Sequence, residues 1–357
     1  MRVRIPQIAR HAGVSRATVD RVLNRRGGVS LEKERAVLQS ARSLGLDRKL
    51  DAPPVKALRV GVLMKPPENP FYERLERGFR EANLLFADYA ITSYITYIDV
   101  LAPETIRRHL RKAIAYYDAL VVVAPAQENV LHDLRLLARR LPVITLATDL
   151  PLDVPHYYVG PSNRQAGRLA GELMGRMLGP AGGRVLLVAG LQEFSGHAER
   201  KAGFFEVLEQ EFSCCTVSAE VESHDQQGAV IAAAVVKALR KDAEVRGIYN
   251  ISQGNDEIAR RVDRLRAERQ LVFIGHDLTP TTRDLLIAKK IDAVIDQEPL
   301  LEARRAIETV LAHYGRLVNI PIEGRTPLRA IFRESVDGGD EEYRPDRRQN
   351  NEVPLTH

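Results

Sequence analysis

Basic and amide side chains gather directly after Gly13-Val14-Ser15, near the amino terminus. Arginine can pair with guanine through two hydrogen bonds, a small apolar side chain can contact the thymine methyl group, and asparagine or arginine can hold phosphates. On a helix that starts after Ser15, the exposed or leading positions are Arg16, Ala17, Thr18, Asp20, Arg21 and Asn24, followed by Arg25 and Arg26. These residues are candidates for contacts with the major groove and backbone of DNA.

A second group of polar side chains follows β-branched runs further along the chain, where strands would end. Its members are Asn69, Asp149, Arg200, Asn255, Asp277 and Gln297, and the aromatic pair Phe71-Tyr72 lies close to the first of them. Planar side chains with paired donors and acceptors suit vicinal hydroxyls, and aromatic faces cover the apolar patches of a sugar ring. Each residue alone has an ordinary role, such as a turn or a helix cap. Their joint placement indicates a sugar-binding cleft.

Three short helices would position the first group. Apolar residues recur at helical spacing from Ile5 to Ala12, and Ser15 and Ser30 can cap a second and a third helix. The three-residue turn between the first two helices is typical of a helix-turn-helix. The first fifty residues hold twelve Lys and Arg against four Asp and Glu, a local excess of +8. A basic helical hairpin whose charges only keep it soluble is the alternative.

From Leu58 onward, short β-branched runs alternate with amphipathic stretches, which predicts an α/β fold with parallel doubly wound sheets. The length of this region favours two lobes with a cleft between them. We expect a helix-turn-helix domain over 1–50, a proline-containing linker over 51–57, an α/β domain over 58–336 (lobes 58–160 with 298–324, and 161–297 with 325–336), and a disordered tail over 337–357.

The first 45 residues closely resemble the amino-terminal domain of LacI-family bacterial transcription regulators. The matching motifs are Ile8-Ala9, Ala12-Gly13-Val14-Ser15, Ala17-Thr18-Val19, Arg21-Val22-Leu23-Asn24 and Val29-Ser30. The resemblance implies that a homodimer binds double-stranded operator DNA, with Arg16, Ala17 and Arg21 at the base-reading positions.

Two features depart from that family. Asp20 stands where the family usually has serine, and a carboxylate there repels phosphate unless it pairs with Arg16 or accepts from a cytosine amino group. The linker contains Pro53-Pro54 in place of the family's Asn-x-x-Ala-Arg-x-Leu stretch, which folds on DNA as a hinge helix. We expect weaker insertion into the minor groove, with operator affinity resting more on phosphate contacts.

Residues from about Leu58 to Leu317 resemble ribose-type sugar-binding proteins, whose fold the LacI-family regulatory domain shares. The motifs are Asn69-Pro70-Phe71-Tyr72, Arg200-x-x-Gly203-Phe204, Asn255-Asp256-Glu257, Asp277 with Thr279-Pro280, and Gln297-x-Pro299. The resemblance implies that Phe71 and Tyr72 stack on the ligand. It also implies that Asn69, Arg200, Asn255, Asp277 and Gln297 bind hydroxyls, and that His224 replaces a further aromatic residue.

The ribose pattern has an Asp-Arg pair where this chain has Ala147-Thr148, and Asp149 is the candidate substitute for that acid. We therefore expect a monosaccharide or polyol that need not be ribose. A phosphorylated sugar is less favoured, because no further cluster of Lys or Arg joins Arg200 at these positions.

No catalytic constellation, cofactor motif or metal site is indicated. Ser195 lacks a Gly-x-Ser-x-Gly elbow, His197-Ala198-Glu199 lacks the cysteine pair of a deaminase, and the glycine-rich segment at 180–184 lacks a P-loop lysine. We expect all three segments to be loop or helix surface. A hydrolase fused to a DNA-binding head is disfavoured.

The composition fits a cytoplasmic regulator. The adjacent cysteines Cys214 and Cys215 favour a reducing compartment, and the chain shows neither a signal peptide nor an apolar run of the ~18 residues that span a bilayer. We expect a repressor of carbohydrate genes that is controlled by a small effector. The alternatives are a purine or nucleoside effector and DNA binding that is independent of an effector. An exported transport receptor is disfavoured, because it would lack the DNA-binding head.

Overall fold

The computed structural model describes residues 5–23, 29–44, 56–191, 193–223, 228–317 and 324–336. The chain forms two compact units, residues 1–56 and 57–357. The expected proline-containing linker over 51–57 falls almost entirely outside the described residues, as does the expected tail over 337–357.

The first unit is a helix-turn-helix, as the sequence predicts. Its helices are α1 (Ile5–His11), α2 (Arg16–Leu23) and α3 (Leu31–Ser43). Ile8, Val19 and Val37 are fully buried and form the centre of its small core. The Ser15 hydroxyl caps α2 by accepting a hydrogen bond from the Thr18 amide (3.1 Å). Gly13 has φ +64°, a conformation that glycine adopts without strain at the end of α1.

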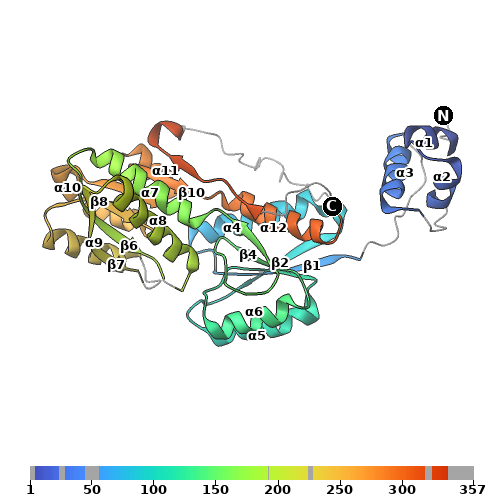
Figure 1. The fold of residues 1–357 in the computed structure, drawn as a ribbon, viewed down its shortest axis with the longest axis horizontal. Coiled ribbons are helices and arrows are strands. Elements are labelled where there is room, and N and C mark those ends of the chain that lie inside the picture. Colours follow the sequence, from blue (N-terminus) through green and yellow to red (C-terminus); the bar gives the residue numbers. More distant parts are fainter. Residues whose placement is uncertain are drawn as a thin grey trace, which may run out of the picture. The chain divides into compact units, whose positions relative to one another are not determined.

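One lobe of the second unit, lobe 1, is built on a parallel sheet with the strand order β2-β1-β3-β4-β5-β11. The strands are β1 (Leu58–Met64), β2 (Ile91–Tyr97), β3 (Ala119–Val122), β4 (Val143–Leu146), β5 (Tyr157–Gly160) and β11 (Gly324–Arg325). Helices α4 (Pro70–Leu85) and α12 (Pro299–His313) cover one face, and α5 (Pro103–Tyr116) and α6 (Glu128–Ala138) cover the other (Figure 1). Burial on both faces explains why β3 is apolar throughout, and why β1 and β4 are apolar except at Arg59 and Thr145.

The other lobe, lobe 2, has the strand order β7-β6-β8-β9-β10-β12, in which only β12 is antiparallel to its neighbour. The strands are β6 (Gly183–Ala189), β7 (Cys215–Glu222), β8 (Val245–Asn250), β9 (Val272–His276), β10 (Ala293–Asp296) and β12 (Arg329–Ile331). Helices α7 (Asn163–Leu178) and α8 (Ser195–Glu211) pack on one face, and α9 (Gly228–Lys241), α10 (Asn255–Arg269) and α11 (Pro280–Ile287) pack on the other. Short 3-10 turns occupy Ala87–Tyr89 and Arg333–Ser335.

The chain passes between the two lobes at three places: between β5 and α7, between β10 and α12, and between β11 and β12. Crossings of this kind leave the carboxyl ends of both parallel sheets facing one cleft, which is where ligands bind in open α/β folds. Over the described residues, no helix combines the length and apolar character required to cross a membrane.

Candidate functional site

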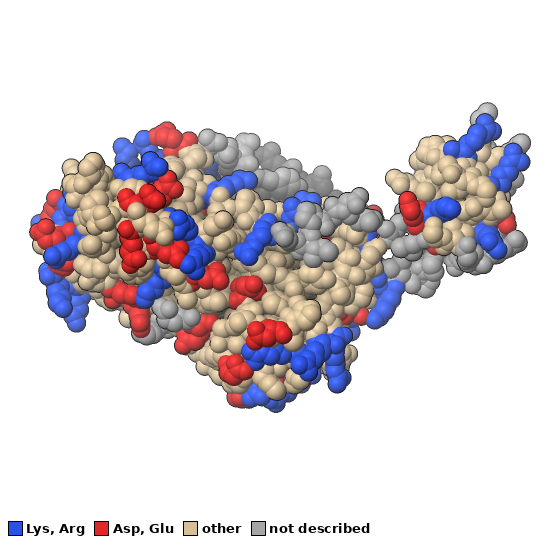
Figure 2. Space-filling model, viewed as in Figure 1, with Lys and Arg blue, Asp and Glu red and all other residues tan. Residues whose placement is uncertain are grey.

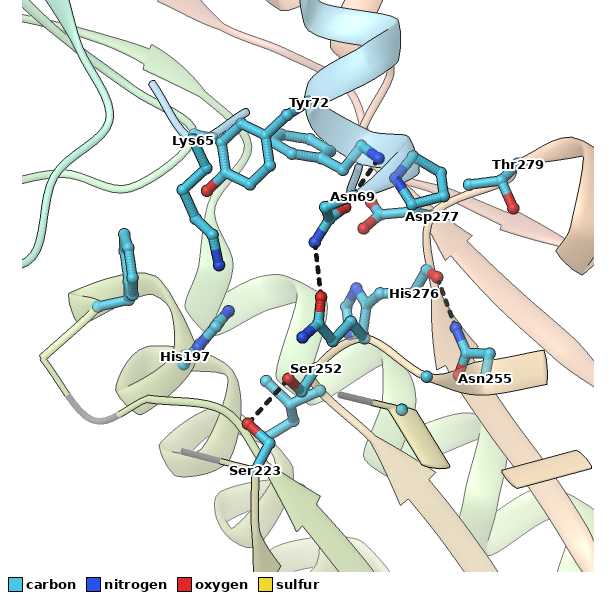
Figure 3. A pocket seen from close by; sticks show the side chains of 18 of the residues that line it. Lys65, Asn69, Tyr72, His197, Ser223, Ser252, Asn255, His276, Asp277 and Thr279 are labelled. Atoms are coloured by element: carbon cyan, nitrogen blue, oxygen red, sulfur yellow. Dashed lines mark hydrogen bonds between the residues drawn. The ribbon is translucent and has the colours of Figure 1, made fainter. Parts of the chain in front are cut away.

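A cavity of about 660 Å³ lies between the lobes, and residues of both lobes line it (Figure 3). The predicted residues that the structure brings together there are Asn69, Phe71, Tyr72, Arg200, Asn255, Asp277 and Gln297. They come from the ends of different strands and the starts of the helices that follow. Their assembly in one cavity is what a ligand-binding cleft requires.

Lobe 1 supplies an aromatic wall. Asn69 caps α4 by accepting from the Phe71 amide (2.9 Å), and its own side-chain amide donates across the cavity to Gln253 Oε1 (3.2 Å). Pro70 then fixes the first turn of the helix. The Phe71 and Tyr72 rings lie 5.1 Å apart with their planes at 85°. A flat sugar ring can therefore stack on only one of the two, while the other presents an edge.

Lobe 2 supplies a buried chain of hydrogen bonds. Arg200 donates to Asn163 Oδ1 (2.7 Å) and to Gln297 Oε1 (2.9 Å), and the Gln297 amide donates to Asp277 Oδ1 (2.8 Å). The Arg200 and Gln297 side chains are 6% and 3% exposed. The chain holds one guanidinium and one carboxylate at fixed positions on the cavity wall, as paired recognition of vicinal hydroxyls requires.

Asn255 is fixed by its neighbours in the same lobe. It donates to the His276 carbonyl oxygen (3.1 Å) and accepts from the Asn250 amide (2.8 Å). Gly275 makes room for it, since a Cβ at that position would lie 2.5 Å from Asn255 Oδ1. The polar tip of Asn255 is thus oriented before any ligand arrives.

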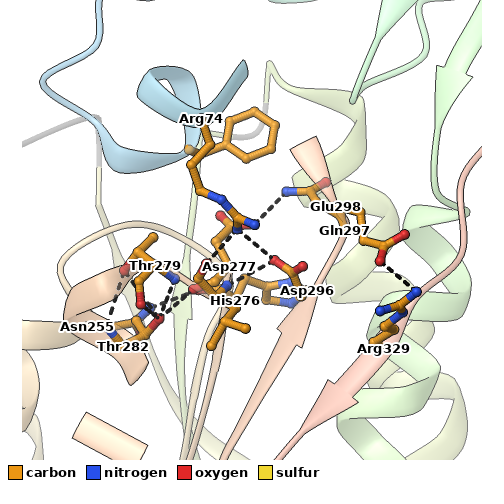
Figure 4. Close-up of polar contacts among 12 residues, drawn as sticks. Arg74, Asn255, His276, Asp277, Thr279, Thr282, Asp296, Gln297, Glu298 and Arg329 are labelled. Carbon is orange, nitrogen blue, oxygen red and sulfur yellow. Dashed lines mark hydrogen bonds and ion pairs between the residues drawn. The ribbon is translucent and has the colours of Figure 1, made fainter. Parts of the chain in front are cut away.

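Three residues that are not glycine have a left-handed backbone next to the cavity or to a segment that passes between the lobes. They are Ala147 (φ +60°), Asp277 (φ +68°) and Glu298 (φ +57°). Each follows a strand end, at β4, β9 and β10 respectively. Such conformations cost about 1–3 kcal/mol each for residues other than glycine, so the surrounding structure must impose them. At Asp277, the turn is held by hydrogen bonds of Thr282 with Thr279 and with the Asp277 carbonyl oxygen (Figure 4).

Burial is the main cause of the pKa shifts of three titratable side chains that line the cavity. It raises the pKa of Asp277, against the opposing effects of Arg200 and Gln297. It lowers the pKa of His276 well below the ordinary value and, together with the charges of Arg200 and Lys65, lowers the pKa of His197 to about 3. Both imidazoles are therefore neutral at physiological pH. His276 is also tied to Tyr249, whose hydroxyl lies 2.9 Å from its Nε2.

An ion pair joins the two lobes beside the cavity. Arg74 on α4 contacts Asp296 Oδ1 (3.2 Å) and donates to the Leu278 carbonyl oxygen, both in lobe 2 (Figure 4). The Leu278 amide donates to the same Asp296 oxygen (3.0 Å). Because its two partners belong to different lobes, this ion pair can form only at the present spacing of the lobes.

The structure corrects the expectation for Asp149. This residue is not among the cavity-lining residues, and its carboxylate accepts instead from Thr145 (2.8 Å) and the Leu150 amide (2.9 Å) and pairs with His156 (3.1 Å). Burial alone would raise the pKa of Asp149, but these hydrogen bonds hold it below the usual value. The turn at Ala147 directs Thr148 to lobe 2 in its place, where the hydroxyl accepts from the Gly196 amide (2.9 Å). His224 lies outside the described residues.

Lys65, His197 and His276 also line the cavity, although their sequence context did not predict it. The expectation that His197 lies on a helix surface is wrong, because its ring packs against the end of β6 at Gly190 and against Phe194 (ring centroids 5.6 Å apart). The available signal was spacing, since His197 and Arg200 stand three residues apart on one face of α8. Lys65 directly follows β1, in the position at which the other site residues follow their strands.

The candidate DNA-contacting side chains lie on α2 of the first unit. Arg16, Ala17 and Arg21 are exposed, while Thr18 and Asp20 are half-buried. Thr18 also shares a hydrogen bond with the capping hydroxyl of Ser15 (2.8 Å). Figure 2 shows Lys and Arg side chains standing out from this unit. Asn24, Arg25 and Arg26 lie outside the described residues.

Within the described parts of the chain, no group of three or more His, Cys, Asp or Glu side chains is placed to hold a metal ion. Of the two cysteines, Cys214 is exposed and Cys215 is buried, and neither forms a disulfide.

A DNA-binding helix-turn-helix joined to a two-lobed binding domain defines a class of bacterial regulators. Family models match both parts of this chain. Residues 4–47 match the model of the bacterial regulatory proteins of the lacI family, and residues 60–316 match the model of the periplasmic binding protein domain. The chain belongs to the LacI family of bacterial regulatory proteins, and its larger unit is a periplasmic binding protein domain.

Individual relatives agree with this assignment. The ribose operon repressor of Halalkalibacterium halodurans is 26% identical over 227 residues, which are 62% of this chain and 65% of that protein. A solute-binding protein from Burkholderia graminis, solved with D-arabinose, has a TM-score of 0.72 at 20% identity over 81% of this chain and 99% of its own. A structure described as a LacI transcriptional regulator, from Bacteroides fragilis, has a TM-score of 0.69 at 15% identity over 79% and 99%. The two structures are similar in fold.

Proposed function

We propose that this protein is a DNA-binding repressor whose affinity for its operator is set by a small sugar or polyol bound between the lobes. The observation that carries the proposal is the buried chain from Arg200 through Gln297 to Asp277, which faces the aromatic wall of Phe71 and Tyr72 across one cavity. This arrangement matches the two requirements of a sugar site, namely paired polar groups and an aromatic face. The role is one of binding rather than catalysis.

The same geometry supports control of DNA binding by the ligand. Lobe 1 (58–160 with 298–324) and lobe 2 (161–297 with 325–336) each supply part of the site, so a ligand that touches both favours one spacing of the lobes. A ligand can shift such an equilibrium only by its difference in affinity for the two spacings. In a homodimer the shift would alter the separation of two recognition helices, which must match two half-sites on the operator. We propose that the protein acts in the cytoplasm, where it would meet its operator.

The names of the relatives guide the choice of effector. One relative is a ribose operon repressor, and one structural neighbour was solved with D-arabinose. We therefore propose a monosaccharide or polyol, from a set in which pentoses and hexoses are tested first. The purine alternative has no comparable support, since lobe 2 offers the cavity an arginine, carboxylate and amide network of the kind that binds hydroxyls.

The test is a thermal-unfolding screen of the full chain against D-ribose, D-arabinose, D-allose, D-galactose, D-glucose and myo-inositol. A ligand that binds only the folded state, present at a concentration a hundred times its Kd, stabilises that state by about 2.7 kcal/mol. The midpoint of thermal unfolding then rises by several degrees. The variant Asp277→Asn should lose this shift, and Arg264→Ala, whose side chain is 92% exposed, should keep it. A shift produced by nucleosides alone would overturn the sugar proposal.

A further inference from the structure

The side chain of Asn163, the first residue of α7, joins the candidate ligand site to lobe 1. It is 1% exposed and lines the cavity. Its Oδ1 accepts from Nε of Arg200 (2.7 Å), and its Nδ2 donates to the carbonyl oxygen of Ala147 in lobe 1 (2.9 Å). The Tyr158 hydroxyl lies further from that carbonyl oxygen (3.4 Å) and donates to the carbonyl oxygen of Pro161 (2.7 Å). The amide of Asn163 therefore makes the closer of these two contacts with the opposite lobe.

Close packing of α7 against α8 fixes the position of Asn163 relative to Arg200. A Cβ at Gly167 of α7 would lie 1.9 Å from the carbonyl oxygen of Arg200. A Cβ at Gly203 of α8 would lie 2.1 Å from the carbonyl oxygen of Arg164. Each helix thus offers a glycine to the backbone of the other, and a larger residue would not fit at either position. We therefore expect Asn163 and Arg200 to move as one body.

The turn formed by residues 147–149, directly after β4, is the part of lobe 1 that this body contacts. Its first residue accepts the hydrogen bond from α7 described above. Thr148 accepts from the Gly196 amide (2.9 Å), and the carbonyl oxygen of Asp149 accepts from the Ser195 hydroxyl. Each residue of the 147–149 turn is therefore bonded to the start of α7 or α8 in lobe 2.

The backbone of the turn is strained at Ala147, whose φ of +60° a residue other than glycine adopts only where its surroundings impose it. Gly196 leaves room for two of the groups that do so. A Cβ at Gly196 would lie 2.8 Å from Nδ2 of Asn163 and 3.2 Å from Oγ1 of Thr148. Loss of the hydrogen bonds from lobe 2 would let the strained turn relax. Elements with two discrete arrangements of this kind can carry coupling between distant sites.

We propose that Asn163 is a positioning residue that transmits effector binding at Arg200 to the 147–149 turn, and through the turn to the spacing of the lobes. The inference rests on the proposed function, because it assumes an effector whose hydroxyls accept from Arg200. Such an effector shares the guanidinium with Asn163, so binding changes how the amide is held. The amide in turn holds or releases the carbonyl oxygen of Ala147. The effector then favours the lobe spacing in which its contacts and those of the turn are both satisfied.

The test is the ratio of an effector's Kd without and with saturating operator DNA, measured on the full-length protein. The probe is the sugar that gives the largest thermal shift among D-ribose, D-arabinose, D-allose, D-galactose, D-glucose and myo-inositol. The DNA is an operator fragment selected in vitro. Linkage makes this ratio equal to the change that the sugar causes in the operator Kd, and we expect at least about fivefold for the wild-type protein. A residue that only supports the fold does not alter the ratio.

The variant Asn163→Asp separates the two halves of the amide. Its carboxylate still accepts from Arg200, but it places an oxygen where Nδ2 donates to the carbonyl oxygen of Ala147. We expect the sugar to bind with a changed Kd and the ratio to fall below about twofold.

Asn83→Asp is the matched control, because it makes the same exchange of atoms inside lobe 1. Oδ1 of Asn83 accepts from the Ser93 amide (2.8 Å), and Nδ2 donates to the Ser93 carbonyl oxygen (3.4 Å). This variant should keep the wild-type ratio. A second test variant, Thr148→Val, removes the hydroxyl that accepts from Gly196 and leaves Asn163 intact. It should lower the ratio by at least about twofold, and it decides the question if Asn163→Asp does not fold.

The outcomes separate this inference from the proposed function. A wild-type ratio in Asn163→Asp overturns the inference and leaves effector control intact, and so does an equal fall of the ratio in Asn83→Asp. If Asn163→Asp does not fold, an unchanged ratio in Thr148→Val overturns the inference instead. If no sugar binds the wild-type protein, or if a bound sugar leaves its ratio at one, the proposed function is contradicted and the inference falls with it.

Discussion

In the helix-turn-helix unit, the candidate DNA-contacting side chains of Arg16 and Arg21 are exposed, whereas in the two-lobed unit Arg200 and Gln297 are only 6% and 3% exposed. The first surface presents charge on a small folded support. The second consists of side chains that also hold the domain together, because they satisfy one another's hydrogen bonds. Changes at Arg16 or Arg21 should therefore affect DNA binding alone, while changes at Arg200 or Gln297 should affect ligand binding and stability together.

The largest effect is expected from Arg200→Ala. The substitution removes two hydrogen bonds from a charged group, each worth about 1.5–3 kcal/mol, so the free energy of unfolding should fall by about 3 kcal/mol or more. Urea unfolding of the full chain measures it, with Arg264→Ala as the exposed control. An unchanged unfolding curve would mean that the buried chain does not support the domain, and the contrast between the two units would be lost.

Acidification should produce the next largest effect through His197. Its pKa in the folded domain is about 3, below the value of roughly 6.5 in an unfolded chain, so the unfolded state binds more protons between these values. Stability therefore falls as the pH drops through this range, by about 2 kcal/mol between pH ~6.5 and ~4.5 for this residue.

The measurement is the pH dependence of the unfolding free energy, compared between the wild-type protein and His197→Gln. The variant should lose that part of the dependence, whereas His132→Gln, on an exposed residue of α6, should retain it. Identical profiles for all three proteins would contradict the burial of a neutral imidazole at this position.

A smaller effect is expected from the DNA-reading surface. Arg16→Ala or Arg21→Ala should weaken specific operator binding by about 1–3 kcal/mol, because each removes a candidate contact with a base edge. The exposure of both side chains predicts no change in the unfolding of the head or in effector affinity. Fluorescence anisotropy with specific and unrelated DNA measures the difference. Equal losses on both DNAs would reassign these arginines to phosphate contacts.

The smallest effect is expected from the cap of α2. Ser15→Ala removes the hydrogen bond from the Thr18 amide and should destabilise the head by about 1 kcal/mol. Ser15→Thr keeps the hydroxyl and should be nearly neutral. Thermal unfolding of the helix-turn-helix unit, followed through amide hydrogen exchange of α2, measures the change. No difference between the two variants would show that the head does not depend on this cap.

The sequence predicts the architecture well where periodicity is local. The helical spacing from Ile5 to Ala12 and the cap at Ser15 indicated the helix-turn-helix, and the alternation of β-branched runs indicated two parallel sheets. The placement of Asn69, Asp277 and Gln297 in one cavity could be predicted, because all three follow strand ends and parallel strands end at the same edge of a sheet.

Other positions depend on neighbours distant in the chain. His197 reads as helix surface by itself, and it is buried only because Gly190 and Phe194 admit its ring. Asp149 follows a strand like the residues that line the cavity, yet the left-handed backbone at Ala147 turns Thr148 toward lobe 2 and leaves Asp149 to bind Thr145 and His156. A backbone conformation of this kind in alanine carries no clear sequence signal.

Effector control requires that ligand binding in the cavity changes the affinity of the protein for its operator. An operator fragment can be selected in vitro with the full-length protein, and its affinity then measured by anisotropy with and without a ligand that shifts thermal unfolding. We predict that the ligand changes the operator Kd by at least about fivefold, the low end of allosteric coupling, and that Asp277→Asn abolishes the change. An operator Kd that stays constant while the cavity is saturated would contradict effector control.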